Sequence, residues 1–166
     1  MAMKVDPKSQ HLINASQGWM ELGDFDAAEL ELTLLPEKDS DSAPVIELRS
    51  EICARTERWA ECEALSKKLV DSIPEHPGYW IKYLNSLFHQ GRFQQAYDES
   101  LEAVDQFPKD EAINYNMACY AAALDKMEEA DSWLEKCYRL GGRRSQLRKK
   151  ARTDPDLVGY WAWKQG

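Results

Sequence analysis

Apolar residues recur along this chain at three- and four-residue spacing, and polar turns interrupt the pattern at regular intervals. Trp80, Leu84 and Leu87 share one face of a predicted helix that ends at Gly91. A second apolar run at helical spacing then continues to Pro108. This pattern predicts two helices joined by a tight turn.

The same turn recurs at intervals of 34 residues. Its four copies are Gly23-Asp24-Phe25, Glu57-Arg58-Trp59, Gly91-Arg92-Phe93 and Asp125-Lys126-Met127. A small residue follows each copy three positions later, namely Ala28, Cys62, Ala96 and Ala130. A small side chain at this point lets the second helix approach the first, because a large one would overpack the hairpin.

This register predicts an all-α chain of eight repeat helices in four pairs. The expected repeat units are residues 9–42, 43–76, 77–110 and 111–142, within one domain that spans 1–166. Pro74 and Pro108, also 34 residues apart, end the second helix of successive units. The polar stretch 39–44 is expected to separate the first two units as a loop.

Residues 143–166 are predicted to cap the array. Gly141-Gly142 is a helix-stop signal, and Asp154-Pro155 is typical of a helix start. The terminal helix would carry Leu157, Tyr160, Trp161 and Trp163. An array must cover its last apolar face, so these side chains are expected to form a cap. The alternative is an aromatic docking site.

Composition indicates a folded chain without catalytic or metal chemistry. Of the 166 residues, 43% are hydrophobic, and no apolar run approaches the length of a membrane span. The four cysteines form no CxxC pair and lie far from the three histidines, so we expect structural thiols and no metal or cofactor. No nucleophile with an oriented base and no phosphate loop is visible, which argues against an enzyme.

Charge is distributed unevenly along the chain. Residues 1–142 hold 14 basic and 27 acidic side chains, whereas residues 143–152 hold six basic and no acidic ones. The acidic body argues against nucleic acid as a partner. Whether the basic segment is a binding surface or a solvated helix stays open at this point.

The repeated positions resemble the tetratricopeptide repeat family over about residues 9–142. The third unit matches best, through Trp80, Gly91, Phe93, Ala96 and Pro108. The closing stretch from Tyr115 to the Asp-Pro-Asp-Leu turn at 154–157 is similar to small stand-alone bacterial members of the family. The resemblance implies a right-handed α-solenoid that is non-enzymatic and binds a peptide or protein segment in its concave groove. A cytoplasmic location is expected separately, because no apolar run is long enough to span a membrane and the first residues do not resemble a leader peptide.

In this family, the groove is lined by repeat positions 2, 5, 9, 12 and 13 of the first helix of each unit. The resemblance therefore implies a groove of Ile13, Gln17, Met20, Glu47, Glu51, Arg55, Ile81, Asn85, Phe88, His89, Tyr115, Cys119 and Ala122. Some of the apolar members could instead pack against neighbouring helices.

Two further expectations concern the partner. The relatives that clamp the carboxylate tail of a chaperone use four cationic or amide residues, whereas the matching positions here are Ile13, Gln17, Gly78 and Lys82. One cation cannot clamp two carboxylates in a fixed geometry, so that partner class is disfavoured. The alternative to groove binding is a structural scaffold that forms a homodimer and leaves the groove unused.

Overall fold

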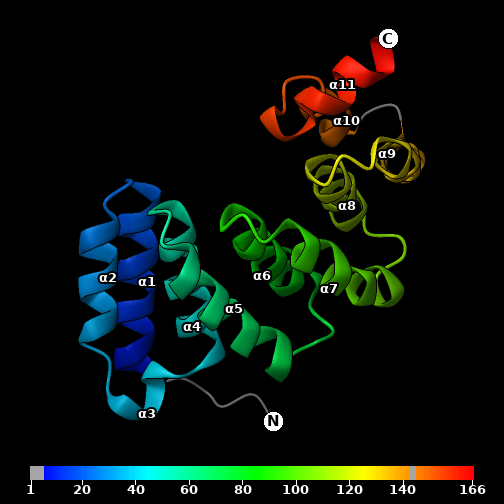
Figure 1. Cartoon of the computed structure of the whole chain (residues 1–166). Coiled ribbons are helices and arrows are strands. Elements are labelled where there is room, and N and C mark those ends of the chain that lie inside the picture. The colour runs from blue at the N-terminus through cyan, green and yellow to red at the C-terminus, as the bar shows by residue number, and fades with distance from the viewer. Residues whose placement is uncertain (1–5, 143–144) are drawn as a thin grey trace. The chain divides into compact units, whose positions relative to one another are not determined.

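The computed structural model describes residues 6–142 and 145–166, and within those ranges every regular element is helical (Figure 1). No helix in the described ranges is both long and apolar enough to cross a membrane. Contacts within the chain define two compact units, Met1–Ile73 and Pro74–Gly166. Each is described by itself.

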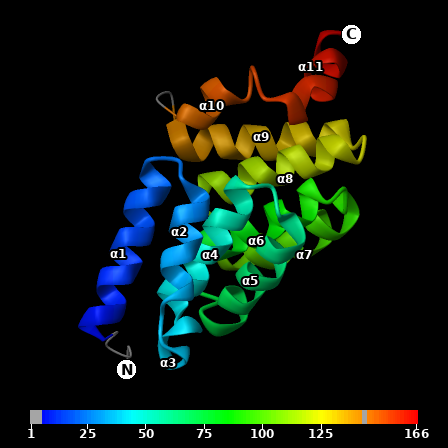
Figure 2. The ribbon, with the colours of Figure 1, turned by 90° about the vertical axis from the view of Figure 1, so that its left-hand side faces the viewer.

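Unit 1, Met1–Ile73, consists of two helical hairpins and a short connecting helix. The elements are α1 (Pro7–Glu21), α2 (Phe25–Thr33), α3 (Glu37–Ser40), α4 (Ala43–Arg55) and α5 (Trp59–Ser72). Helix α1 lies along α2, and α4 lies along α5 (Figures 1 and 2). Helix α4 also contacts α1 and α2, so the two hairpins share one core.

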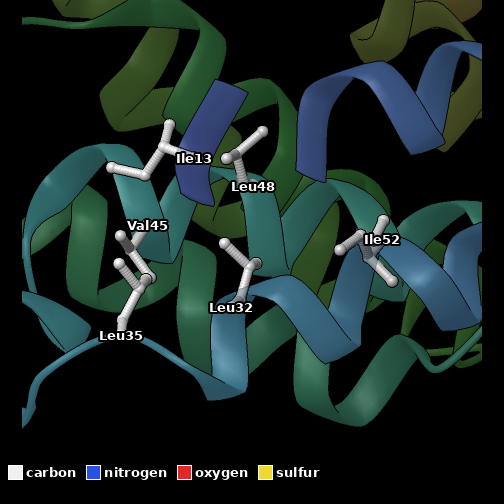
Figure 3. Close-up of a cluster of buried hydrophobic side chains, with 7 residues drawn as sticks. Ile13, Leu32, Leu35, Val45, Leu48 and Ile52 are labelled. Carbon is white, nitrogen blue, oxygen red and sulfur yellow. The ribbon is translucent and has the colours of Figure 1, made fainter. Parts of the chain in front are cut away.

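Buried aliphatic side chains from three helices form the core of unit 1. Figure 3 shows Ile13 of α1, Leu32 of α2 and Val45, Leu48 and Ile52 of α4 in this cluster. Burying one such side chain contributes about 1.5–3 kcal/mol to folding. The cluster therefore holds the first hairpin against α4.

Unit 2, Pro74–Gly166, consists of two hairpins followed by a C-terminal segment. The hairpins are α6 (Pro77–His89) with α7 (Phe93–Gln106), and α8 (Glu111–Ala123) with α9 (Met127–Gly141). The C-terminal segment contains α10 (Gln146–Lys150), the 3-10 turn η2 (Pro155–Leu157) and α11 (Val158–Gln165). All three of these elements contact α8, and α10 and α11 also contact α9.

The turn inside each hairpin has the same backbone geometry. Its first residue has a positive φ in all four copies: Gly23 (80°), Glu57 (58°), Gly91 (75°) and Asp125 (61°). The next N–H donates to the carbonyl five residues earlier at 2.8–3.1 Å, as the Arg58 N–H does to Cys53 O. This bond closes a Schellman motif, which satisfies a carbonyl at the helix end. The four-fold register predicted from the sequence is thus a repeated helix cap.

The small residue after each turn is completely buried. Ala28, Cys62, Ala96 and Ala130 all have an exposed fraction of 0%. All four cysteines of the chain are free and buried. Burial raises the pKa of Cys53 to about 11 and that of Cys137 to about 12, which keeps both thiols protonated and unreactive near neutral pH.

The polar stretch 39–44, expected to be a loop, differs in detail from that expectation. Helix α3 occupies its start, and the buried Ser9 hydroxyl of α1 donates to Asp39 at 2.5 Å. This bond spans 30 residues, so the local polar composition did not reveal it. It ties α3 back to α1.

Candidate peptide-binding surface

The first helix of each hairpin, called helix A below, is α1, α4, α6 or α8. In unit 1, the helix A face contains a pocket of about 390 Å³ between α1 and α4. Gln17, Met20 and Glu21 line it from α1, and Leu48 and Arg55 line it from α4. Three of these five residues were predicted to line the groove.

The unit 1 pocket has an apolar floor and a polar rim. Leu48 is buried in the core and Met20 packs partly against it, whereas Gln17 and Arg55 are exposed. The Arg55 guanidinium lies 5.2 Å from the centre of the Phe25 ring, which holds it at the rim by a cation–π contact. The pocket is open to solvent, so it suits one side chain of a partner better than an enclosed small ligand.

Other predicted groove residues of unit 1 lie at different depths. Glu47 is exposed and Glu51 is half-buried on α4. Ile13 is 3% exposed and belongs to the buried core (Figure 3). Its side chain is enclosed by α2 and α4, so it supports the surface from below.

In unit 2, the α6 members of the predicted groove are mostly engaged in packing. Ile81 and Asn85 are half-buried, and the Tyr120 hydroxyl donates to Asn85 Oδ1 at 2.7 Å. Phe88 is buried, with its ring centre 5.1 Å from that of Tyr120. His89, at the end of α6, is exposed.

The α8 members of the predicted groove lie beneath the C-terminal segment. Tyr115 is 1% exposed, and its hydroxyl donates to Asp154 Oδ2 at 2.6 Å. Lys150 of α10 pairs with the same carboxylate at 3.3 Å and lies over the Tyr115 ring at 5.1 Å. Cys119 is also buried, and Ala122 is half-buried. The remaining space between α6, α8 and this segment is a polar cavity of about 80 Å³.

Comparison with known proteins finds similar solved structures but no similar sequence family. No family model matches the chain, and no curated protein matches it. Several solved structures do: a thermophilic TPR protein of Thermus thermophilus (TTC0263) superposes with a TM-score of 0.68 at 15% identity, over 93% of this chain and 87% of that one. This chain has the tetratricopeptide-repeat fold.

Two other structures lead to the same tetratricopeptide-repeat fold. MamA from strain AMB-1 gives a TM-score of 0.69 at 16% identity, over 85% of this chain and 77% of that one. PilF of Pseudomonas aeruginosa gives 0.68 at 21% identity, over 96% of this chain and 76% of that one. At identities this low, the superpositions establish the fold alone. The partner has to be inferred from the chain's own surfaces.

Within this tetratricopeptide fold, the Asp154 carboxylate of the C-terminal segment interacts with three groups. Burial of the Asp154 carboxylate opposes ionisation, but hydrogen bonds from Tyr115 and the Asp156 N–H and the Lys150 ammonium outweigh burial and lower the Asp154 pKa from its ordinary value. Burial, and then the hydrogen bond to Asp154, raise the Tyr115 pKa. The pair is therefore an anionic carboxylate accepting from a neutral phenol.

The same corner contains a group of possible metal ligands. Donor atoms of Cys119, Asp154 and Asp156 lie within 4.8 Å of one another. However, burial raises the pKa of the Cys119 thiol, and the Lys150 ammonium already balances Asp154. This arrangement is explained by the attachment of the C-terminal segment.

Reasoning from the sequence missed Lys150 and Asp154 as partners of helix α8. The Asp-Pro pair at 154–155 signalled a helix start, and the Asp154 side chain does accept from the Asp156 N–H at 3.1 Å. Its second oxygen bonds Tyr115, 39 residues away in the chain. A local sequence signal identifies the cap but not the distant partner.

Proposed function

We propose that this chain is a protein-binding module that holds an apolar segment of another protein on the α1/α4 face of unit 1. The observation that carries the proposal is the pocket of about 390 Å³, with an apolar floor at Met20 and Leu48 and a polar rim at Gln17 and Arg55. Such a pocket suits one apolar anchor of a peptide or helix, while the rim can bond its backbone or polar groups.

The charged residues of α4 indicate which charge the partner segment should carry. Glu47 is exposed on α4 beside Leu48, and Arg55 lies two turns further along the same helix. A partner segment with an apolar anchor and a basic residue toward Glu47 fits this order of charges. The proposal places no requirement on the α8 face, where Tyr115 and Cys119 are buried.

The test begins with peptides selected from a displayed random library on the full-length chain. Their affinities are then measured for the unchanged chain, Met20→Ala and Gln17→Arg. Truncating an apolar anchor costs about 1–2 kcal/mol, which is roughly a tenfold loss of affinity. Gln17→Arg alters the exposed rim and leaves the core intact.

The matched control is Leu101→Ala, which truncates an exposed leucine of α7 in unit 2. It should change affinity by less than about twofold, within the range of ordinary surface substitutions. Peptides that bind Met20→Ala and Gln17→Arg as tightly as the unchanged chain, with melting points preserved, would place the binding surface elsewhere. Failure to select any peptide would count equally against the proposal.

A further inference from the structure

The outer face of α2 in unit 1 exposes a stripe of apolar residues. Leu30 and Leu34 are 63% and 62% exposed, and Asp26 precedes them by one turn on the same face. Side chains four residues apart in a helix lie one above the other, so the three form a continuous strip. The side of α2 that bears Ala28 and Leu32 is buried instead.

The sequence around this strip is acidic, since residues 21–37 contain six acidic and no basic side chains. Two cations from outside this stretch also reach α2, because Arg58 pairs with Glu29 at 3.0 Å and Arg49 donates to Leu32 O at 3.3 Å. Asp26 is exposed and lies in line with the two leucines. We call the strip Asp26, Leu30 and Leu34 the α2 face.

A second exposed apolar surface lies in unit 2, in the C-terminal segment. A pocket of about 610 Å³ is lined by Arg152, Thr153, Val158, Trp161, Ala162 and Gln165. The Trp161 indole N–H donates to Ala151 O at 2.6 Å, and its ring packs edge-on to Tyr160 with centres 4.9 Å apart. Trp161 is thus held in place as a rigid wall, and Val158 beside it is 65% exposed.

This C-terminal pocket has one cation at its rim, Arg152. Two other cations of residues 145–153 are held elsewhere, because Arg148 lies over the Tyr138 ring and Lys150 pairs with Asp154. Asp154 also borders the pocket, but its buried carboxylate accepts a hydrogen bond from Tyr115 and pairs with Lys150. Arg152 is exposed at the pocket and supplies the nearest cation for an incoming carboxylate.

The α2 face and the C-terminal pocket therefore complement each other in both polarity and charge. We infer that the α2 face of one copy of this chain docks into the C-terminal pocket of a second copy. Leu30 and Leu34 would fill the space beside Val158 and Trp161, and Asp26 would face Arg152. The inference is independent of the α1/α4 face.

This contact joins two different surfaces, so it is heterologous. Each bound copy still offers one unused α2 face or one unused pocket, and assembly continues until a ring closes or a filament forms. The charges across the contact also make it weaken as salt screens them. Continued assembly and weakening by salt distinguish this contact from a symmetric dimer held by apolar contacts.

The first measurement is sedimentation velocity of the full-length chain between about 10 µM and about 1 mM. The average mass should rise with concentration and fall when salt increases from about 0.05 M to about 0.5 M. Leu30→Lys and Arg152→Glu should each weaken association at least tenfold. Leu101→Lys and Lys109→Glu, at exposed positions outside both surfaces, should leave it unchanged.

The decisive measurement mixes the two disabled variants. Leu30→Lys retains an intact C-terminal pocket, and Arg152→Glu retains an intact α2 face, so an equimolar mixture should form a one-to-one dimer that grows no further. All four altered side chains are exposed, and a preserved melting point confirms that each variant folds.

Three results would overturn the inference. One is a chain that stays monomeric over the whole concentration range, which would assign the pocket to another partner. Another is association that survives Leu30→Lys or Arg152→Glu. The third is a mixture in which the two variants stay monomeric although the unchanged chain associates, as a symmetric interface would produce.

Discussion

The helix A faces of α1 in unit 1 and α8 in unit 2 present the same repeat positions, but they differ in whether a partner can reach them. In unit 1, position nine of the first repeat is Gln17, which is exposed at the edge of a pocket. In unit 2, position nine of the fourth repeat is Cys119, which is buried in the region that the C-terminal segment covers. The repeat register thus sets where a side chain points, and the segment that follows the last repeat decides whether a partner can reach it.

The largest effect should come from removing the segment that creates this difference. Deleting residues 153–166 removes the fully buried Leu157 and the nearly buried Tyr160, each worth about 1.5–3 kcal/mol of burial. We expect the truncated chain to lose about 3–6 kcal/mol of stability or to aggregate. Hydrogen exchange should rise in α8 and α9, which the segment contacts.

Removal of residues 164–166 alone, which keeps the Trp163 ring packed against Tyr160, is the control for that deletion. It takes away the exposed pair of Lys164 with Asp131 and leaves the buried side chains in place. The expected loss is below about 1 kcal/mol, as for other surface ion pairs. Equal effects of the two deletions would contradict the assignment of Leu157 and Tyr160 as the anchors.

A smaller effect is expected from Tyr115→Phe, which removes the donor to Asp154. Near neutral pH, the loss of a hydrogen bond to a buried carboxylate should cost about 1.5–3 kcal/mol. Because the folded-state pKa of Asp154 lies below that of an unfolded aspartate, this stabilisation is fully present above the unfolded pKa and is lost as pH falls through the folded pKa. The difference between variant and unchanged chain should therefore shrink under acid conditions.

The comparison for Tyr115→Phe is Tyr120→Phe, which removes a donor to the neutral Asn85 at 2.7 Å. A bond between neutral groups contributes about 0.5–1.5 kcal/mol and should show no such dependence on acid. Urea denaturation at several pH values measures both. A Tyr115→Phe cost that is the same at every pH would show that Asp154 is not its partner.

The part of the fold that follows from local rules was predictable from the sequence. Turn residues such as Gly91 and the small Ala96 fix the hairpins, because their roles depend on neighbours within a few positions. The burial of Tyr115 was not predictable, since it depends on Asp154 returning to α8 from 39 residues away. Ile13 illustrates the same limit, because an apolar residue on helix A suits either a groove or a core.

The smallest expected effect concerns the turns, where the two units are alike. Glu57 in unit 1 and Asp125 in unit 2 adopt the left-handed conformation that glycine adopts at the matching positions. Glu57→Gly should stabilise the chain by about 0.5–1 kcal/mol, since strain of about 1–2 kcal/mol is relieved and part of it is offset by unfolded-state entropy. Asp125→Gly should gain less, because Asp tolerates this conformation better. Chemical denaturation tests both, and destabilisation by Glu57→Gly would contradict the shared turn geometry.

The central claim, that the helix A face is accessible on α1 in unit 1 and closed over α8 in unit 2, is tested most directly by thiol labelling at repeat position nine. A maleimide reacts with the full-length Gln17→Cys variant, and mass spectrometry locates the label. The introduced thiol should react at least about a hundredfold faster than the native Cys119, which must wait for local opening of the C-terminal segment. Labelling of Cys119 in the intact chain at the same rate as the thiol introduced by Gln17→Cys would contradict the account.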